Sequence, residues 1–203
     1  MRGFRSLEFI LGALLVGGIG LAILFSGLLF PDGGESINLM ARLARPFASA
    51  AHPLGTDPLG RDVLARVIVG GKISLQVGAF SVAGAVAVGV AMGLVSGYYR
   101  GVWDIIVMRF ADVQLALPFI LMAITFIAIF GGGLTNTIIL LIVSQWVQYA
   151  RLVRGSVLAL REREFVLAAK AIGVPDRAIL FGHLLPNLIG PVIVLMTLNV
   201  ANN

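Results

Sequence analysis

The side chains of this sequence offer little for catalysis. Cysteine is absent and only two histidines occur, which excludes a thiol nucleophile, a disulfide framework and a histidine-rich metal site. The Gly-Gly-Lys sequence at residues 70–72 ends like a phosphate-binding loop, but that loop requires a glycine at Arg66 and a serine or threonine at Ile73. We therefore expect no catalytic residue, metal or cofactor in this chain, and predict that it is not an enzyme.

The composition is that of a membrane protein. Hydrophobic residues make up 59% of the chain and charged residues 12%, far from the usage of soluble domains. The mean hydropathy of +1.00 arises from long uninterrupted apolar stretches, which indicate several passes through a lipid bilayer. The net charge of +5 is spread over the ends of these stretches and forms no basic stripe, so nucleic-acid binding is not expected.

The apolar stretches predict an all-α transmembrane helix bundle of five helices. A helix needs about 20 residues to cross about 30 Å of hydrocarbon. The charge-free stretch from Val113 to Ala150 is too long for one crossing, and turn residues at 131–136 divide it. The first stretch is longer than the core of a secretory signal and has no clear cleavage site, so we expect it to be retained. The predicted helices span residues 9–30, 73–98, 113–131, 135–153 and 187–203.

These helices predict two regions. Residues 1–72 comprise the first helix and an external loop, and residues 73–203 form the core, with a cytoplasmic loop at 154–186. The last helix looks cut short at Asn203. In the second helix Gly89, Gly93 and Gly97 share one face, which predicts close contact with another helix, although glycine is common in membrane helices generally.

The distribution of basic residues predicts the orientation. With a cytoplasmic N-terminus, the inner segments 1–8, 100–112 and 151–177 hold 10 Lys or Arg among 48 residues. The outer segments 31–72 and 131–136 hold 5 among 48. Because cytoplasmic loops carry the excess of Lys and Arg, we expect the N-terminus inside the cell.

The predicted cytoplasmic loop contains an amphipathic helix. Arg161, Glu162 and Lys170 can stay solvated on its polar side. Gly173 suits a left-handed helix cap, and Pro175 suits the start of a second helix, so the loop is predicted to be a helix-turn-helix. The apolar side recurs at i, i+3, i+4 and i+7 in Phe165, Ala168, Ala169 and Ile172.

This apolar side has two interpretations. The helix could lie in a groove of a cytoplasmic partner with Phe165 as anchor, or it could rest on lipid headgroups or on its own bundle. Periodicity alone leaves both open.

The loop resembles the "EAA" loop of permease subunits of ATP-binding-cassette importers. The resemblance rests on Ala168-Ala169, on Gly173 after three intervening residues, and on Leu185-Pro186 further on. The sequence departs from the pattern at Leu167, where glutamate is expected, and at His183, where isoleucine is expected. The resemblance implies that these residues couple the chain to an ATPase.

A second resemblance lies in the external loop. The stretch from His52 to Leu64, continuing to Lys72-Ile73-Ser74-Leu75, looks like the signature of one permease of the dipeptide, oligopeptide and nickel importers. Its motif residues are His52, Gly55, Thr56, Asp57, Gly60, Arg61 and Asp62. This loop could dock a binding protein through Asp57, Arg61 and Asp62, or it could be a turn that orders the start of the next helix.

The family resemblance implies six helices with both termini inside a bacterial inner membrane. It also implies a second homologous permease, two ATP-binding-cassette ATPases that bind the ATP, and an extracytoplasmic solute-binding protein. The alternative is a secondary transporter or channel, which would usually place ionisable residues inside its spans. The polar residues Gln145, Gln148, Asn187 and Asn199 either line a solute path or satisfy neighbouring helices.

Overall fold

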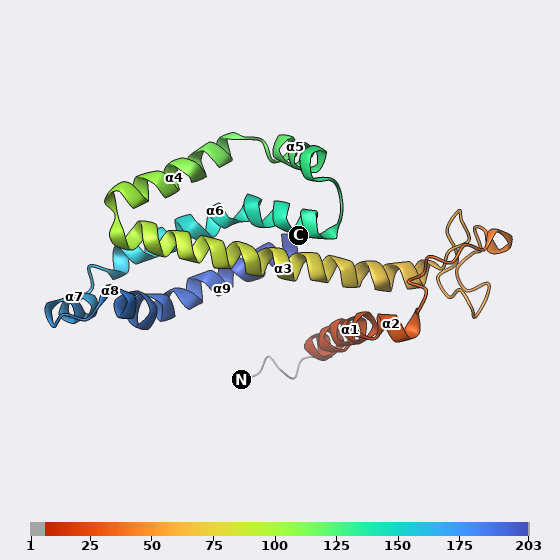
Figure 1. Ribbon diagram of the computed structural model, residues 1–203. Coiled ribbons are helices and arrows are strands. Elements are labelled where there is room, and N and C mark those ends of the chain that lie inside the picture. The colour runs from red at the N-terminus through yellow and green to blue at the C-terminus, as the bar shows by residue number, and fades with distance from the viewer. Residues whose placement is uncertain (1–6, 203) are drawn as a thin grey trace. The chain divides into compact units, whose positions relative to one another are not determined.

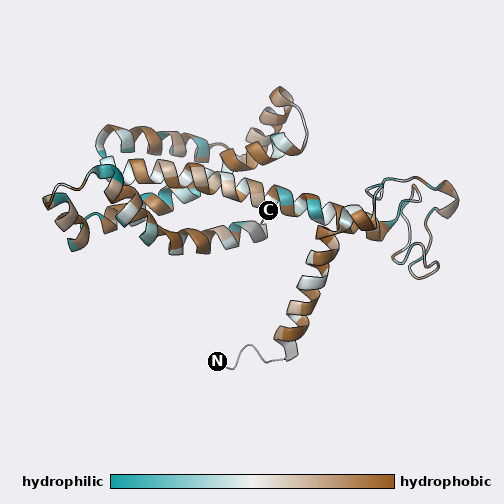
Figure 2. Ribbon diagram, turned by 60° about the horizontal axis from the view of Figure 1, so that its bottom comes forward, coloured by the Kyte–Doolittle hydropathy of each residue, from teal (hydrophilic) through white to brown (hydrophobic). Residues whose placement is uncertain are grey.

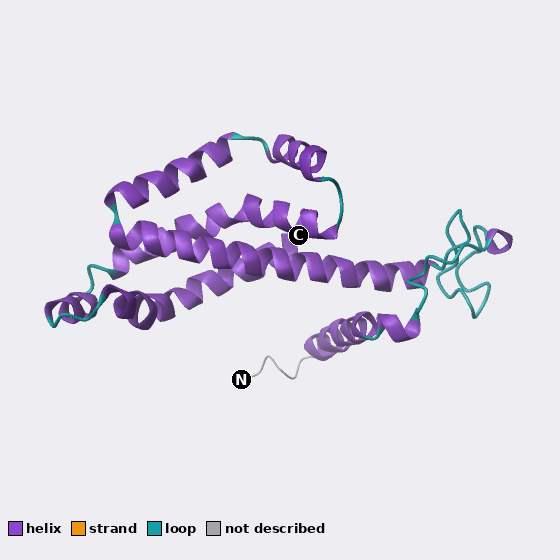
Figure 3. Ribbon diagram, in the orientation of Figure 1, coloured by secondary structure: helices purple, strands orange, loops and turns teal. Residues whose placement is uncertain are grey.

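Every regular element in the structure is a helix (Figures 1 and 3). The computed structural model describes residues 7–202, and within that range no strand occurs beyond one isolated bridge between Thr56 and Asp62. The predicted all-α class is therefore confirmed. The chain divides into two compact units, Met1–Gln76 and Val77–Asn203.

The first unit contains a broken helix and a long loop. The helix predicted at 9–30 is α1 (Leu7–Leu24) followed by the single turn α2 (Ser26–Leu29), with the break at Phe25. The loop after it carries the short 3-10 helix η2 (Leu39–Ala41) and leads into α3 (Val63–Tyr99).

Helix α3 begins ten residues earlier than its apolar stretch predicts. Arg66 and Lys72 bounded that stretch in the sequence, but charged residues limit lipid exposure and do not end a helix. The helix begins where Asp62 accepts a hydrogen bond from the backbone N–H of Ala65 at 3.1 Å, which satisfies one of the free donors of the first turn.

The second unit holds the other helices. In Figure 1 the α3, α6 and α9 ribbons run alongside one another, with α7 and α8 beyond the same end of this group. The further elements are α4 (Gly101–Ala116), α5 (Phe119–Phe130), α6 (Leu134–Leu160), α7 (Glu164–Ala171), α8 (Asp176–Ala178), the π-helix η3 (Ile179–Leu184) and α9 (Leu185–Asn202).

The predicted helix at 113–131 is wrong in its bounds. Residues 101–112, assigned to a loop from their charges, form most of α4. The chain then bends by 95° between α4 and α5. Pro118 causes the break, because it has no N–H to donate and forces Leu117 into the extended conformation, with ψ of 127°.

The helices differ in how well they suit a membrane. By length and hydropathy α3 and the segment Asp176–Asn199 could each span a bilayer, and the bent pair of α4 and α5 could form a third span. Among the described residues α6, predicted as a span at 135–153, does not meet the same criterion because polar residues interrupt its apolar stretch. Figure 2 shows hydrophobic residues along most of each helix.

The glycine face of α3 packs against α6, as the sequence predicts. A Cβ atom added at Gly93 would lie 2.6 Å from the carbonyl oxygen of Ala150, and one at Gly97 would lie 2.8 Å from Cβ of Val157. Gly89 is buried in the same contact. Only glycine allows the two backbones to approach this closely, so these residues set the spacing of α3 and α6.

An ion pair holds three helices together where α3 meets α4. Asp104 in the first turn of α4 receives two hydrogen bonds from the Arg154 guanidinium of α6, at 2.5 and 2.6 Å. Ser96 of α3, which is fully buried, donates to the same carboxylate at 2.5 Å. Such a bidentate pair fixes orientation as well as distance.

The largest buried cluster joins α3, α6, α7, η3 and α9. It places the helix-turn-helix segment on the ends of the long helices. Its members are Leu94, Tyr98, Val153, Val157, Val166, Ala169, Ile179, Leu180, Leu184, Leu188 and Val192.

Candidate functional site

The predicted helix-turn-helix is present. Helix α7 ends in a Schellman motif, in which the N–H of Gly173 donates to Lys170 O and the N–H of Val174 donates to Ala169 O, both at 3.0 Å. Gly173 has a φ of +78°, the left-handed conformation that the sequence predicts for it. Pro175 is the N-cap of α8. The turn therefore aims α8 and η3 back toward the bundle.

Helix α7 carries apolar residues on two sides. Val166 and Ala169 are buried in the chain's own core, and full burial of a valine side chain contributes about 1.5–3 kcal/mol. Phe165, Ala168 and Ile172 are exposed, Ile172 by 81%. The prediction that Ala169 shares the free apolar side is therefore wrong, because i, i+3 spacing with Val166 turns it toward the core.

The residues expected on the polar side of the cytoplasmic helix make contacts that the sequence did not predict. Lys170 is not simply solvated, since its Nζ lies 4.8 Å from the centre of the Tyr98 ring. Arg161 donates from Nη1 to the backbone carbonyl of Tyr98 at 2.9 Å and lies 3.4 Å from a carboxylate oxygen of Glu162. Two of the three residues expected in solvent thus contact the end of α3.

The rest of the first motif forms an unusual helical turn. His183 lies in the π-helix η3, and its backbone carbonyl accepts a hydrogen bond from the Asn187 side chain at 2.7 Å. Leu185 begins α9 and packs beside the main core cluster, whereas Pro186 follows it with an exposed ring. Single π-turns often mark functional positions in helices.

The external-loop motif, residues 52–62, folds onto the preceding part of the loop. Gly55 and Gly60 have φ of +79° and +74°, and any side chain at either position would collide with the backbone of Ala44 or Asn38. Thr56 is buried and its hydroxyl group accepts a hydrogen bond from the N–H of Ala44 at 2.9 Å. The two glycines and the threonine are therefore required for packing.

Asp57 is the centre of the charged network in this motif. Its carboxylate accepts hydrogen bonds from Arg61 Nε at 2.7 Å and from Arg66 Nη1 at 2.8 Å. It also accepts from the backbone N–H groups of Leu59 and Arg61. Partial burial favours the neutral acid, but these donors outweigh it and lower the pKa of Asp57 to about 2.

The last charged residues of the motif start α3. Asp62 caps the helix with one oxygen and contacts His52 Nδ1 with the other at 3.0 Å. The charges of the motif are therefore paired within the loop, which supports the interpretation of a turn ordering the next helix. The residues left exposed for a partner are Leu54, Pro58 and Leu59.

Comparison with known proteins identifies the family of this chain. Residues 89–203 match the family described as the binding-protein-dependent transport system inner membrane component. This chain belongs to that family. The match includes all of α4 to α9 and the helix-turn-helix.

The curated relatives of this family member are permeases. It is 42% identical over 189 residues to a dipeptide transport system permease protein of Alkalihalophilus pseudofirmus, covering 93% of this chain and 62% of the relative. It is 40% identical over 152 residues to a glutathione transport system permease protein of Pectobacterium atrosepticum, covering 75% of this chain and 50% of the relative. The chain thus spans between half and two thirds of these relatives.

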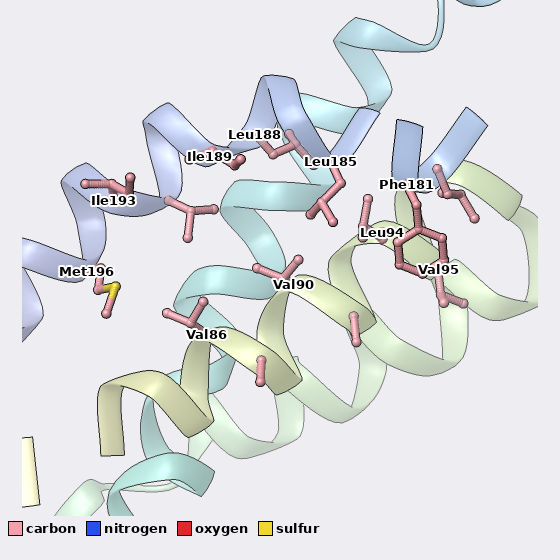
Figure 4. A pocket seen from close by; sticks show the side chains of 14 residues that line it. Val86, Val90, Leu94, Val95, Phe181, Leu185, Leu188, Ile189, Ile193 and Met196 are labelled. Atoms are coloured by element: carbon pink, nitrogen blue, oxygen red, sulfur yellow. The ribbon is translucent and has the colours of Figure 1, made fainter. Parts of the chain in front are cut away.

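An apolar groove of about 590 Å³ lies between α3 and the η3–α9 segment of this inner membrane component (Figure 4). The labelled side chains of the two walls, such as Val90 and Leu188, face one another across it. All its lining residues are apolar, so it lacks the hydrogen-bonding groups that would hold a charged peptide. The groove is suited to apolar contact along these helices.

The polar residues considered for a solute path mostly satisfy neighbouring groups. Asn199 of α9 donates to the Tyr149 hydroxyl group at 2.9 Å, and Asn187 bonds within its own helix. Trp146 donates to Gln114 of α4 at 2.7 Å, a bond that sequence reasoning missed because only the fold brings α4 beside α6. Gln148, which Asn199 contacts at 3.4 Å, is exposed, as is Asn187.

Proposed function

We propose that this chain is a permease subunit of an ATP-driven importer for short peptides. It works with a second, homologous permease, two ATP-binding-cassette ATPases and a binding protein on the outer face. The ATPases hydrolyse ATP, and the permease pair alternates between outward- and inward-facing states. Family membership supports this proposal over a secondary transporter, whose solute needs no binding protein.

The observation that carries the proposal is the exposed apolar side of α7. Phe165, Ala168 and Ile172 lie on a short helix whose other side is anchored in the core of the chain. Water-exposed apolar residues on a helix held this firmly are suited to a groove on a partner protein. We assign this side to the ATPase.

The names of the curated relatives support one substrate class. Their names specify dipeptide and glutathione, both of which are short peptides. We therefore favour a short peptide over nickel, which the sequence resemblance also allowed.

The substitution Ile172→Glu tests the assignment. It places a charge at the C-terminal end of the apolar side without touching the core, so the chain should fold and insert normally. We expect ATPase binding to weaken by on the order of 2 kcal/mol, about 30-fold, as at a truncated interface anchor. The measurement is the affinity of purified ATPase for the reconstituted permease pair, together with peptide uptake.

Leu167→Glu is the matched control. Leu167 is half exposed on the same helix, about 160° around the axis from Phe165 and about 140° from Ile172, and glutamate is the residue that the EAA pattern expects there. The control should keep ATPase binding. Equal binding by the wild type and Ile172→Glu would contradict the assignment of this surface.

A further inference from the structure

Tyr98 connects the end of α3 to three other segments. Its hydroxyl group donates a hydrogen bond to Oδ1 of Asp176 in α8 at 2.5 Å. Its ring lies 4.8 Å from the Lys170 ammonium of α7, and its backbone carbonyl accepts from Arg161, the C-cap residue of α6. The side chain itself is buried in the main core cluster, with 6% of the residue exposed.

These contacts differ in kind from the packing around them. Val166 and Ala169 hold α7 on the bundle by apolar contacts, which have little directional preference and tolerate small sliding movements. A hydrogen bond to a carboxylate and a cation over an aromatic face are stronger and depend on geometry. Tyr98 therefore fixes the direction in which α7 and α8 are attached to α3.

Helix α3 is in turn held against the long helix α6 along its C-terminal part. Its glycine face lies against the α6 backbone at Gly89, Gly93 and Gly97. On another side it forms one wall of the apolar groove opposite α9. A displacement of the last turn of α3 would therefore change the distances between the long helices, because packed interfaces switch between discrete arrangements.

We propose that Tyr98 is the positioning residue that transmits movement of α7 and α8 to α3. The inference rests on the proposed function, in which ATPases bind the exposed side of α7, and it names the residue that carries the resulting displacement into the bundle. The phenol hydroxyl group is the essential part, since it alone reaches Asp176.

The test is Tyr98→Phe in the full reconstituted importer. The variant keeps the ring beneath Lys170 and removes only the hydroxyl group. We expect peptide transported per ATP hydrolysed to fall about 2- to 30-fold, the range for residues that couple two sites without contacting a ligand. ATPase subunits should remain bound, and the thermal stability of the complex should stay near that of the wild type.

Tyr99→Phe is the matched control. Tyr99 packs edge-on against Tyr98. Its hydroxyl group forms no hydrogen bond with another side chain or backbone group among residues 7–202. This control should keep the wild-type ratio of peptide transported to ATP hydrolysed. Asp176→Ala should lower the ratio as Tyr98→Phe does, and the double variant should lower it no further.

A wild-type ratio in assembled Tyr98→Phe complexes would overturn the proposal. If that variant does not assemble, the substitution Asp176→Ala decides, because it removes the acceptor of the same hydrogen bond at an exposed position, and an unchanged ratio there would also overturn the proposal. Failure of the proposed function looks different, because the wild-type complex itself would then show no ATP-dependent uptake.

Discussion

At the residue scale, the external-loop motif shows charged side chains committed to internal structure. Asp57 looks in the sequence like a surface contact for a binding protein, but it accepts hydrogen bonds from Arg61 and Arg66. Backbone hydrogen bonds, such as that from the N–H of Thr56 to Ala44 O, also hold the loop. The ion pairs and the two left-handed glycines add to them.

The low pKa of Asp57 predicts a pH dependence. Because its folded pKa, about 2, lies below the usual 3.8, ionised Asp57 stabilises the loop at pH above 4. That stabilisation should be lost as the pH falls from about 4 toward about 2. Hydrogen exchange of the backbone amides of Leu59 and Arg61, corrected for intrinsic rates, should rise across this window.

The control for this prediction is Asp57→Asn. The variant cannot ionise at this position, so these two amides should exchange faster than in the wild type at neutral pH and show little further change on acidification. Hydrogen bonds from Ser36 and Gly34 also lower the pKa of Asp32. Its protonation would change hydrogen exchange only near residues 32–36. Unchanged protection of Leu59 and Arg61 in the wild type from pH 5 to pH 2 would contradict the role of Asp57.

At the element scale, the contact of α3 with α6 depends on the missing side chains of three glycines. Replacing Gly93 by alanine adds a methyl group 2.6 Å from a backbone oxygen of α6, which must move away. We expect Gly93→Ala to destabilise the helix pair by about 1–3 kcal/mol, as overpacking does in a tight core. Thermal unfolding of the detergent-purified chain measures the change.

Gly78 supplies a control within the same helix. It is also buried, but no atom lies within 4 Å of the position that its Cβ would occupy. Gly78→Ala should therefore be neutral or stabilising by up to about 1 kcal/mol, since alanine is the better helix former. Equal destabilisation by Gly93→Ala and Gly78→Ala would show that the close contact at Gly93 does not set the distance between α3 and α6.

At the scale of the whole molecule, the predicted orientation remains to be measured. The excess of basic residues predicts that 151–177 are cytoplasmic and that 31–72 are external. Because the chain has no cysteine, single introduced cysteines report on each side. Position 50 suits the external site, because Ala50 is exposed and its side chain makes no ion pair.

We expect an impermeant thiol reagent to label Ala50→Cys but not Arg163→Cys in intact spheroplasts. Permeabilised cells should show labelling at both positions, which controls for accessibility. Labelling of position 163 alone in intact spheroplasts would contradict the predicted orientation. The exposed side of α7 would then lie on the opposite side of the membrane from the ATPases.

Much of this protein could be read from its sequence. Lipid requires long apolar helices, so composition alone determined the all-α class. Glycines at four-residue spacing indicated that one face of α3 contacts another helix, and Gly173 indicated the left-handed cap of α7. These features are local, because each depends on residues within a few turns of one another.

Only the tertiary structure decided which groups meet. Periodicity placed Ala169 with Phe165 and Ile172, but burial against η3 and α3 placed it in the core. Charge suggested that Lys170 was solvated, whereas the fold brought it over the Tyr98 ring. Contacts between residues far apart in the chain depend on how helices pack, and a single helix's pattern does not encode its neighbours.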